Sequence, residues 1–199
     1  MPEPWASLGH RLHRTTGSVL RRAGLAHLVR SSPPIFDLGV IGDRRTAAIM
    51  TRDGEVAWFC PGRFDAPSLL GSLLDPDVGV AWRIELDGAK PAGRRYLGHS
   101  GVLETTLGHP AGKLSITDWM PLGRAGGPRG AICRRFTAAP AKLTMSLIPR
   151  PHNSRRIPHL RTDSGAAVVV DGRFRLQASH PASVENGKIV VHVPSGEPS

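Results

Sequence analysis

The sequence has little cysteine, no long hydrophobic run and no recognisable metal or phosphate motif. Its two cysteines, Cys60 and Cys133, are too few for a disulfide framework in 199 residues and are not spaced as metal ligands. Two free thiols favour a reducing compartment, so we expect a cytoplasmic protein. No stretch reaches the roughly 18 apolar residues of a membrane-spanning helix. The nine histidines form no HExxH motif, and no GxxxxGK[ST] loop is present, so we expect neither a metal site nor a cofactor.

Long helices are also disfavoured, because glycine and proline together make up about a fifth of the chain, with 23 and 18 residues. Apolar and polar residues instead alternate with a period of two, which is typical of strands with one buried face. Asp-Gly pairs at 53–54, 87–88 and 171–172 are suited to tight turns between such strands. We expect an all-β fold, an antiparallel β-sandwich, with a short helix near 67–74. The expected strands are 36–41, 46–50, 55–59, 82–86, 102–107, 113–117, 131–137, 143–147, 166–170, 173–177 and 188–193.

The formal net charge of +10 comes from 22 arginines against four lysines. Such a charge attracts phosphates, yet the five Arg-Arg pairs are scattered over separate expected elements. Five Phe and one Tyr supply no aromatic motif for stacking bases. Solvated arginines on outward strand positions are therefore expected rather than a nucleic-acid-binding groove.

Residues 1–34 differ from the remainder of the chain. They are basic, and they lack the apolar core of a secretory signal. The run Ser31-Ser32-Pro33-Pro34 then interrupts any regular element. We expect 1–34 to be a flexible extension, and an over-long gene start remains open as its origin. Residues 35–199 are expected to form the β-sandwich domain.

Two groups of charged residues are candidates for a site. Asp118 falls on the same strand face as Leu114 and Ile116, and a buried carboxylate needs a partner or becomes neutral. We expect it to form a structural pair with an arginine. Arg63, Phe64 and Asp65 place an aromatic ring between two charges in a turn, which either braces its own loop or contacts a sugar. A glycosidase needs two converging carboxylates, and spacing does not show which of the 16 acidic residues would converge. No catalytic residue is assigned.

Several motifs follow one another along the chain. The first block is Ile41-Gly42-Asp43-Arg44-Arg45-Thr46, followed by Trp58-Phe59-Cys60 and Arg63-Phe64-Asp65-Ala66-Pro67. Later segments are Arg95-Tyr96-Leu97, Thr117-Asp118-Trp119-Met120-Pro121 and Ile148-Pro149-Arg150-Pro151. In this order they resemble the start of glycoside hydrolase family 15, the glucoamylase-like and trehalase-like enzymes, over about residues 35–182.

The resemblance implies an N-terminal β-sandwich of the super-sandwich type that docks against a catalytic toroid of paired helices. The acid and base glutamates belong to that toroid, and nothing in this chain resembles it. The family's module also runs further than this chain, which implies a truncated sandwich lacking its last strands. By the same resemblance, Arg63, Phe64 and Asp65 form a substrate-rim or domain-docking loop, and trehalose or an α-glucan is the sugar contacted.

Three hypotheses follow. The chain is a non-catalytic module of a trehalase-like or glucoamylase-like hydrolase, so that this chain alone is not an enzyme. Alternatively it is a stand-alone module that binds carbohydrate or polyanion, with Trp58, Trp82 and Trp119 as stacking platforms. The third hypothesis is a remnant without function. The choice between trehalose and glucan linkages would depend on residues of the absent toroid.

Overall fold

The computed structural model describes residues 33–74, 80–123, 130–137 and 139–198, which belong to one compact unit, Pro33–Ser199. Of the expected N-terminal extension 1–34, all but Pro33 and Pro34 lies outside the described residues. Among the described residues, a 3-10 turn, Ile35–Asp37, precedes the first strand.

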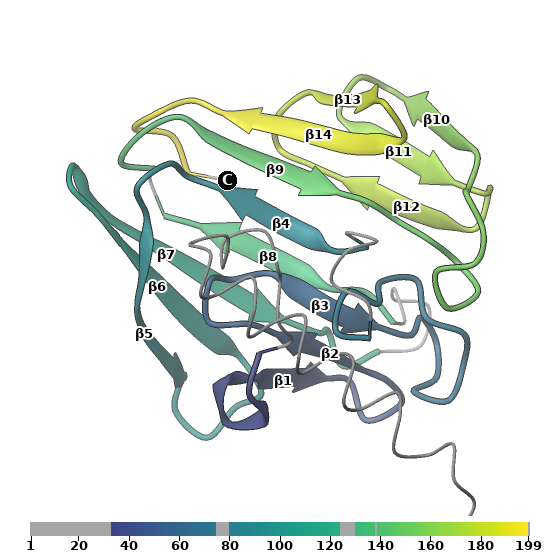
Figure 1. Cartoon of the computed structure of the whole chain (residues 1–199), viewed down its shortest axis with the longest axis horizontal. Coiled ribbons are helices and arrows are strands. Elements are labelled where there is room, and N and C mark those ends of the chain that lie inside the picture. The colour runs from purple at the N-terminus through teal and green to yellow at the C-terminus, as the bar shows by residue number, and fades with distance from the viewer. Residues whose placement is uncertain (1–32, 75–79, 124–129, 138, 199) are drawn as a thin grey trace, which may run out of the picture. The chain divides into compact units, whose positions relative to one another are not determined.

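Fourteen strands form three antiparallel sheets (Figure 1). The seven-stranded sheet contains, in spatial order, β1 (Gly39–Gly42), β2 (Ala47–Met50), β3 (Val56–Phe59), β4 (Trp82–Glu85), β9 (Leu143–Leu147), β14 (Lys188–Val193) and β13 (Ala182–Glu185). The four-stranded sheet contains β5 (Lys90–Tyr96), β6 (Leu103–His109), β7 (Gly112–Trp119) and β8 (Cys133–Phe136). The three-stranded sheet contains β10 (Leu160–Asp163), β11 (Ala167–Val170) and β12 (Phe174–Gln177).

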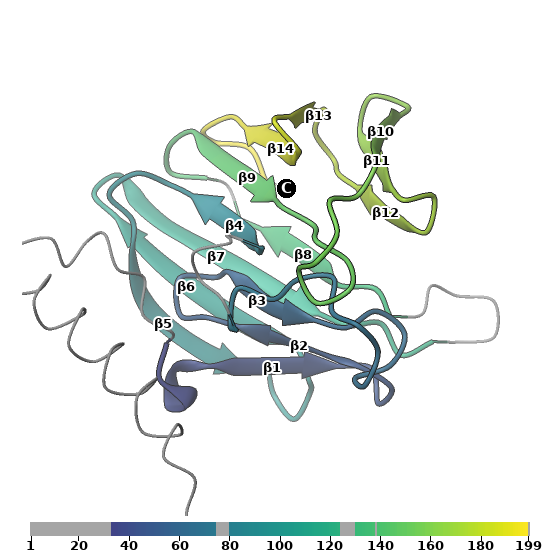
Figure 2. The same cartoon turned by 45° about the vertical axis from the view of Figure 1, so that its right-hand side comes forward.

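The four-stranded sheet lies across the inner face of the seven-stranded sheet, and their facing side chains form the core (Figure 2). Alternate residues of β6 and β7 point inward, and Leu103, Leu114 and Ile116 are fully buried there. They share one cluster with Ile41 and Met50 of the seven-stranded sheet. Each such side chain contributes roughly 1.5–3 kcal/mol of transfer free energy. The expected antiparallel β-sandwich is therefore confirmed.

Three strands were missed because their sequences lack a clear apolar alternation. β5 contains Pro91 and Gly93 and is exposed along most of its length, as an edge strand tolerates. β10 and β13 span only four residues each and combine charged with small apolar side chains. Short edge strands obtain their stability from the neighbouring strand, so their own composition is a weak signal.

The short helix expected near 67–74 is wrong. No α-helix occurs among the described residues, and Leu70 instead forms an isolated bridge with Phe59 of β3. The N–H groups of Leu69 and Leu70 both donate to the Phe59 carbonyl, at 2.8 and 3.4 Å. Burial of these two leucines against β3 therefore outweighs the local helical spacing, and Gly71 favours the irregular conformation. None of the described elements is a helix long and apolar enough to cross a membrane.

Candidate functional site

The turn formed by Arg63, Phe64 and Asp65 holds an aromatic ring in solvent. Arg63 donates from Nε to Asp65 Oδ1 at 2.8 Å and from Nη2 to Oδ2 at 2.9 Å, a bidentate pair. This hydrogen-bonded pair raises the pKa of Arg63 and lowers the pKa of Asp65. Phe64 lies between the two charges, 75% exposed, and its N–H donates to the Arg45 carbonyl at 3.2 Å. The ion pair thus stabilises the turn, and Phe64 is exposed to solvent.

Asp43 and its neighbours join this turn to the loops at 43–46 and 130. The Asp43 Oδ1 atom accepts hydrogen bonds from the N–H groups of Arg45 and Thr46, both at 2.9 Å, and Oδ2 accepts one from Gly130 N–H at 3.1 Å. Burial by itself raises the pKa of Asp43, but the N–H donors outweigh it and hold the pKa below its ordinary value. Gly130 has a φ of 63°, and a side chain there would meet the backbone of Gly62. The loops at 43–46, 61–65 and 130 are therefore packed tightly together.

The loop that follows β9 is fixed by three consecutive left-handed residues. His152, Asn153 and Ser154 have φ values of 59°, 57° and 68°, and this conformation costs a non-glycine residue roughly 1–2 kcal/mol. The Asn153 Oδ1 atom accepts a hydrogen bond from Ser68 N–H at 2.8 Å. Arg150 N–H donates to the Leu69 carbonyl at 3.0 Å. These bonds attach the loop to the segment that follows the Phe64 turn.

These loops follow β1, β3, β7 and β9 and lie at one end of the sandwich (Figure 2). Apolar side chains are exposed on them at Phe64, Leu122 and Ile157, which are 75%, 59% and 73% exposed. Exposed arginines lie on the same loops, namely Arg44, Arg45, Arg63, Arg155 and Arg156. We call these eight residues the loop-end surface. Exposed apolar side chains together with basic ones are the composition expected of a docking surface for an acidic partner.

Asp118 lies away from this surface, inside the sandwich. Its side chain is fully buried and accepts hydrogen bonds from Arg134, at 2.7 Å from Nε and 3.2 Å from Nη2. The two residues are direct partners in the register of β7 and β8. The Arg134 guanidinium also lies 4.8 Å from the ring centroid of Trp82. This arrangement neutralises a buried carboxylate, and the structure does not bring Asp118 together with Arg63 or Asp65.

Among the residues that the structure describes, no three His, Cys, Asp or Glu side chains gather as metal ligands. The two thiols, Cys60 and Cys133, are free, and burial raises the pKa of both. Of the three tryptophans considered as stacking platforms, Trp82 packs against the core, and Trp58 and Trp119 are half-buried.

Sequence reasoning missed Asp43, Asn153 and Arg134. Asp43 had a local signal, because an aspartate that opens a turn commonly accepts hydrogen bonds from the residues two and three positions later. Asn153 had a weaker one, since asparagine tolerates the left-handed region. Arg134 had no local sequence signal, because its pairing with Asp118 depends on the register between β7 and β8.

Comparison with known proteins gives a consistent result. The trehalase-like N-terminal family matches residues 21–181, a range that begins within the segment expected to be an extension. The trehalase of Mycolicibacterium smegmatis is 39% identical over 92 residues, which are 46% of this chain and 14% of that protein. Trehalase 1 of Sulfolobus acidocaldarius is 31% identical over 161 residues, which are 80% of this chain and 26% of that protein. No solved structure gives a significant match.

The matched region thus spans about a quarter or less of the length of these relatives. The family match covers most of the present chain and agrees with the β-sandwich and with the order of the loop motifs described above. The chain belongs to the trehalase-like N-terminal domain family.

Proposed function

We propose that this chain is a non-catalytic N-terminal module of a trehalase-like hydrolase of glycoside hydrolase family 15. Its role is to dock a helical catalytic domain through the loop-end surface and to form part of the wall of the active site. The observation that supports this most directly is Phe64, an aromatic side chain held 75% exposed by a bidentate ion pair. Because the turn is already braced, its backbone loses little conformational entropy when a partner covers it.

The charge distribution supports the same proposal. Arg63 and Arg156 of the loop-end surface are paired with Asp65 and Asp171. Arg44, Arg45 and Arg155, together with the net charge of +10, favour a partner with an acidic face. Hydrogen bonds of Asp43 to Thr46 and Gly130 hold the loop that carries Arg44 and Arg45. The relatives are trehalases in which the matched region is only a minor part, so we propose trehalose or a related α-glucoside as the substrate of the assembled enzyme.

A chimera tests this proposal. The whole chain replaces the region of the Sulfolobus acidocaldarius trehalase 1 that matches 80% of it, 161 residues, and glucose release from trehalose is measured. We expect the chimera to hydrolyse trehalose and the isolated chain to release none. Phe64→Ala should lower the activity of the chimera about tenfold, as expected for loss of an interface anchor.

Phe36→Ala is the matched control for the chimera. Phe36 is 79% exposed but precedes β1, at the opposite end of that strand from the loop-end surface. The control should leave activity unchanged. Glucose release by the chain alone, or equal losses from both variants, would contradict the proposal.

A second candidate is a stand-alone polyanion-binding domain, favoured by a hollow of about 260 Å³ lined by Asp43, Arg44, Arg45 and Gly123. Binding of heparin or DNA would weaken steeply with salt, whereas sugar stacking would not. Retention on immobilised heparin at physiological salt, lost in an Arg44→Ser/Arg45→Ser variant, would favour this candidate over a docking module.

A further inference from the structure

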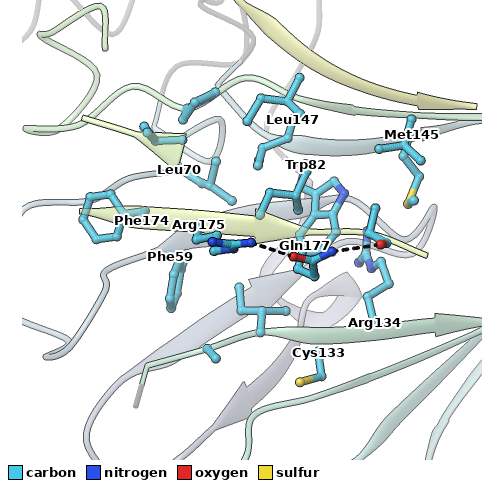
Figure 3. Close-up of a pocket in the computed structure, with 18 of the residues that line it drawn as sticks. Phe59, Leu70, Trp82, Cys133, Arg134, Met145, Leu147, Phe174, Arg175 and Gln177 are labelled. Atoms are coloured by element: carbon cyan, nitrogen blue, oxygen red, sulfur yellow. Dashed lines mark hydrogen bonds between the residues drawn. The ribbon is translucent and has the colours of Figure 1, made fainter. Parts of the chain in front are cut away.

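A cavity of about 550 Å³ lies between the edges of two sheets (Figure 3). Its floor is the inner face of the seven-stranded sheet, with Met145 and Leu147 of β9 and Ile189 and Val191 of β14. One wall contains Cys133, Arg134 and Phe136 of β8, and the other contains residues 174–177 of β12. The lining is mostly apolar, so the cavity suits an apolar occupant better than a sugar.

Both walls are strand edges. β8 is the last strand of the four-stranded sheet and β12 the last of the three-stranded sheet, and among the described strands each pairs with one neighbour. The Arg134 side chain is only 1% exposed, although the residue as a whole is partly exposed. Its exposed part is therefore the main chain. Unpaired edges of this kind are templates for an added strand.

Arg134 also offers a side-chain donor beside the cavity. Its Nε and Nη2 atoms are bonded to Asp118, but the buried Nη1 atom has no hydrogen-bond partner among the described residues. A buried donor without a partner costs free energy. An occupant that brings a carbonyl or carboxylate oxygen to Nη1 removes this cost, whereas a purely apolar occupant does not.

The described part of the chain ends beside this cavity. Gly196 N–H donates to the Ala139 carbonyl at 2.8 Å, and Ala139 N–H donates to the Glu197 carbonyl at 3.2 Å. The Glu197 carboxylate lies 3.1 Å from Nε2 of His180. Ala139 closely follows β8, and His180 closely follows β12. The longer trehalase relatives contain further polypeptide after the matched region. A chain that continues from this point therefore starts beside the edges of β8 and β12.

We propose that this cavity is a strand-binding groove, and that its occupant is the extended segment of trehalase polypeptide that follows this module in the longer relatives. The segment lies between β8 and β12, adds main-chain hydrogen bonds to at least one of these edges, turns alternate apolar side chains toward Met145 and Leu147, and presents an acceptor to Arg134 Nη1. This inference rests on the proposed function, because it assigns the module a second contact with its own enzyme.

Synthetic peptides and the full chain test the groove. Overlapping peptides of about ten residues, longer than a typical strand, cover the part of the Sulfolobus acidocaldarius trehalase 1 that directly follows the region matched by 80% of this chain. Binding is followed by fluorescence anisotropy. Occupancy is followed by amide exchange of β8 and β12, which reports edge pairing, with the amides of β13 as internal reference because β13 does not line the groove.

We expect one stretch of peptide to bind and to slow the exchange of at least one amide within 133–136 or 174–177 about tenfold or more. Leu176→Lys, which places a charge in the groove wall, should weaken binding about tenfold, equivalent to about 1.4 kcal/mol. Val184→Lys is the matched control, since Val184 is 37% exposed on the edge strand β13 and does not line the groove. If Leu176→Lys does not fold, the pattern of amide protection in the wild-type chain still tests the inference.

Three results would overturn the inference. The first is that no peptide protects the amides of 133–136 or 174–177, and the second is that a scrambled peptide protects them equally. The third is concentration-dependent protection without peptide, which would identify a second copy of this chain as the occupant. An active chimera whose β8 and β12 amides exchange as fast as in the isolated chain would refute the groove but leave the docking function standing. Peptide binding with an inactive chimera would support the groove and refute the docking function.

Discussion

At the scale of single residues, the Asp118–Arg134 pair is the most heavily buried charge arrangement described, with side chains 0% and 1% exposed. Taking both charges out of water is costly, and their mutual hydrogen bonds offset that cost only while both are present. Trp82 adds a cation–π contact at 4.8 Å. The pair thus makes the stability of β7 and β8 depend on two specific side chains.

We expect Asp118→Ala to lower the free energy of unfolding by about 3–5 kcal/mol, because it leaves the Arg134 guanidinium buried without a counter-charge. The double variant Asp118→Leu/Arg134→Met should recover most of this loss. Urea unfolding followed by tryptophan fluorescence measures both. A double variant as unstable as the single one would show that packing, and not the unpaired charge, causes the effect.

Asp43 should make folding sensitive to acid. Its pKa is lower in the folded protein than the ordinary 3.8. The carboxylate therefore stabilises the fold fully above the unfolded-state pKa, and this contribution is lost as the pH falls through the lower folded-state pKa. Asp43→Asn should cost about 1–2 kcal/mol at neutral pH, through the lost bond to Gly130. The difference in stability between the variant and the wild type should shrink as the pH falls through the folded-state pKa of Asp43, because the wild-type carboxyl is then protonated too.

Urea midpoints measured across the acid range, with Asp87→Asn as the control, test this prediction. Asp87 is exposed in a turn, so its variant should follow the wild-type pH profile. An Asp43→Asn variant that loses as much stability at low pH as at neutral pH would contradict the prediction.

At the scale of elements, the terminal strands of the three sheets have main-chain groups that need protection. β1 is an edge of the seven-stranded sheet, and the Tyr96 hydroxyl of β5 covers it. That hydroxyl accepts a hydrogen bond from Val40 N–H at 3.0 Å and donates one to the Val40 carbonyl at 2.8 Å. A side chain thus occupies main-chain groups that would otherwise be free to pair with another molecule, which is a recognised way to protect an edge.

Tyr96→Phe should therefore lower the free energy of unfolding by about 1–2 kcal/mol, since two hydrogen bonds are lost and the ring is kept. Amide exchange at Val40 should accelerate more than at Ile41, and the variant should aggregate sooner on heating. Equal acceleration at both amides would indicate global destabilisation instead of an opened edge.

At the scale of the whole molecule, one hydrophobic cluster unites the sheets. It includes Leu103 and Leu114 of the four-stranded sheet, Met145 of the seven-stranded sheet and Val168 and Val170 of the three-stranded sheet. A shared core of this kind makes unfolding cooperative.

We accordingly expect a single sharp thermal transition from the monomer, with coincident circular dichroism and fluorescence midpoints. Two separate transitions would show that the β10–β12 sheet unfolds by itself. A broad transition accompanied by precipitation would favour the remnant hypothesis over a functional module.

Several features were determined by the sequence alone. Alternation of period two located most strands and placed Asp118 on the face of Leu114 and Ile116, because successive side chains of a strand point to opposite faces. The ordered loop motifs identified the family resemblance. Local composition failed where burial against a distant strand decided the conformation, as at Leu69 and Leu70, which pack beside Phe59 and form no helix.

Only the tertiary structure decided which residues meet. The partner of Asp118 is Arg134 because β7 and β8 pair in one register. Asp43 organises the loop end because loops separated by up to 87 positions converge on its carboxylate. The groove exists because β8 and β12 end their sheets on either side of one apolar floor. Alternation along a strand is a local property of the backbone, whereas register, loop convergence and the position of sheet edges depend on the packing of segments far apart in the chain.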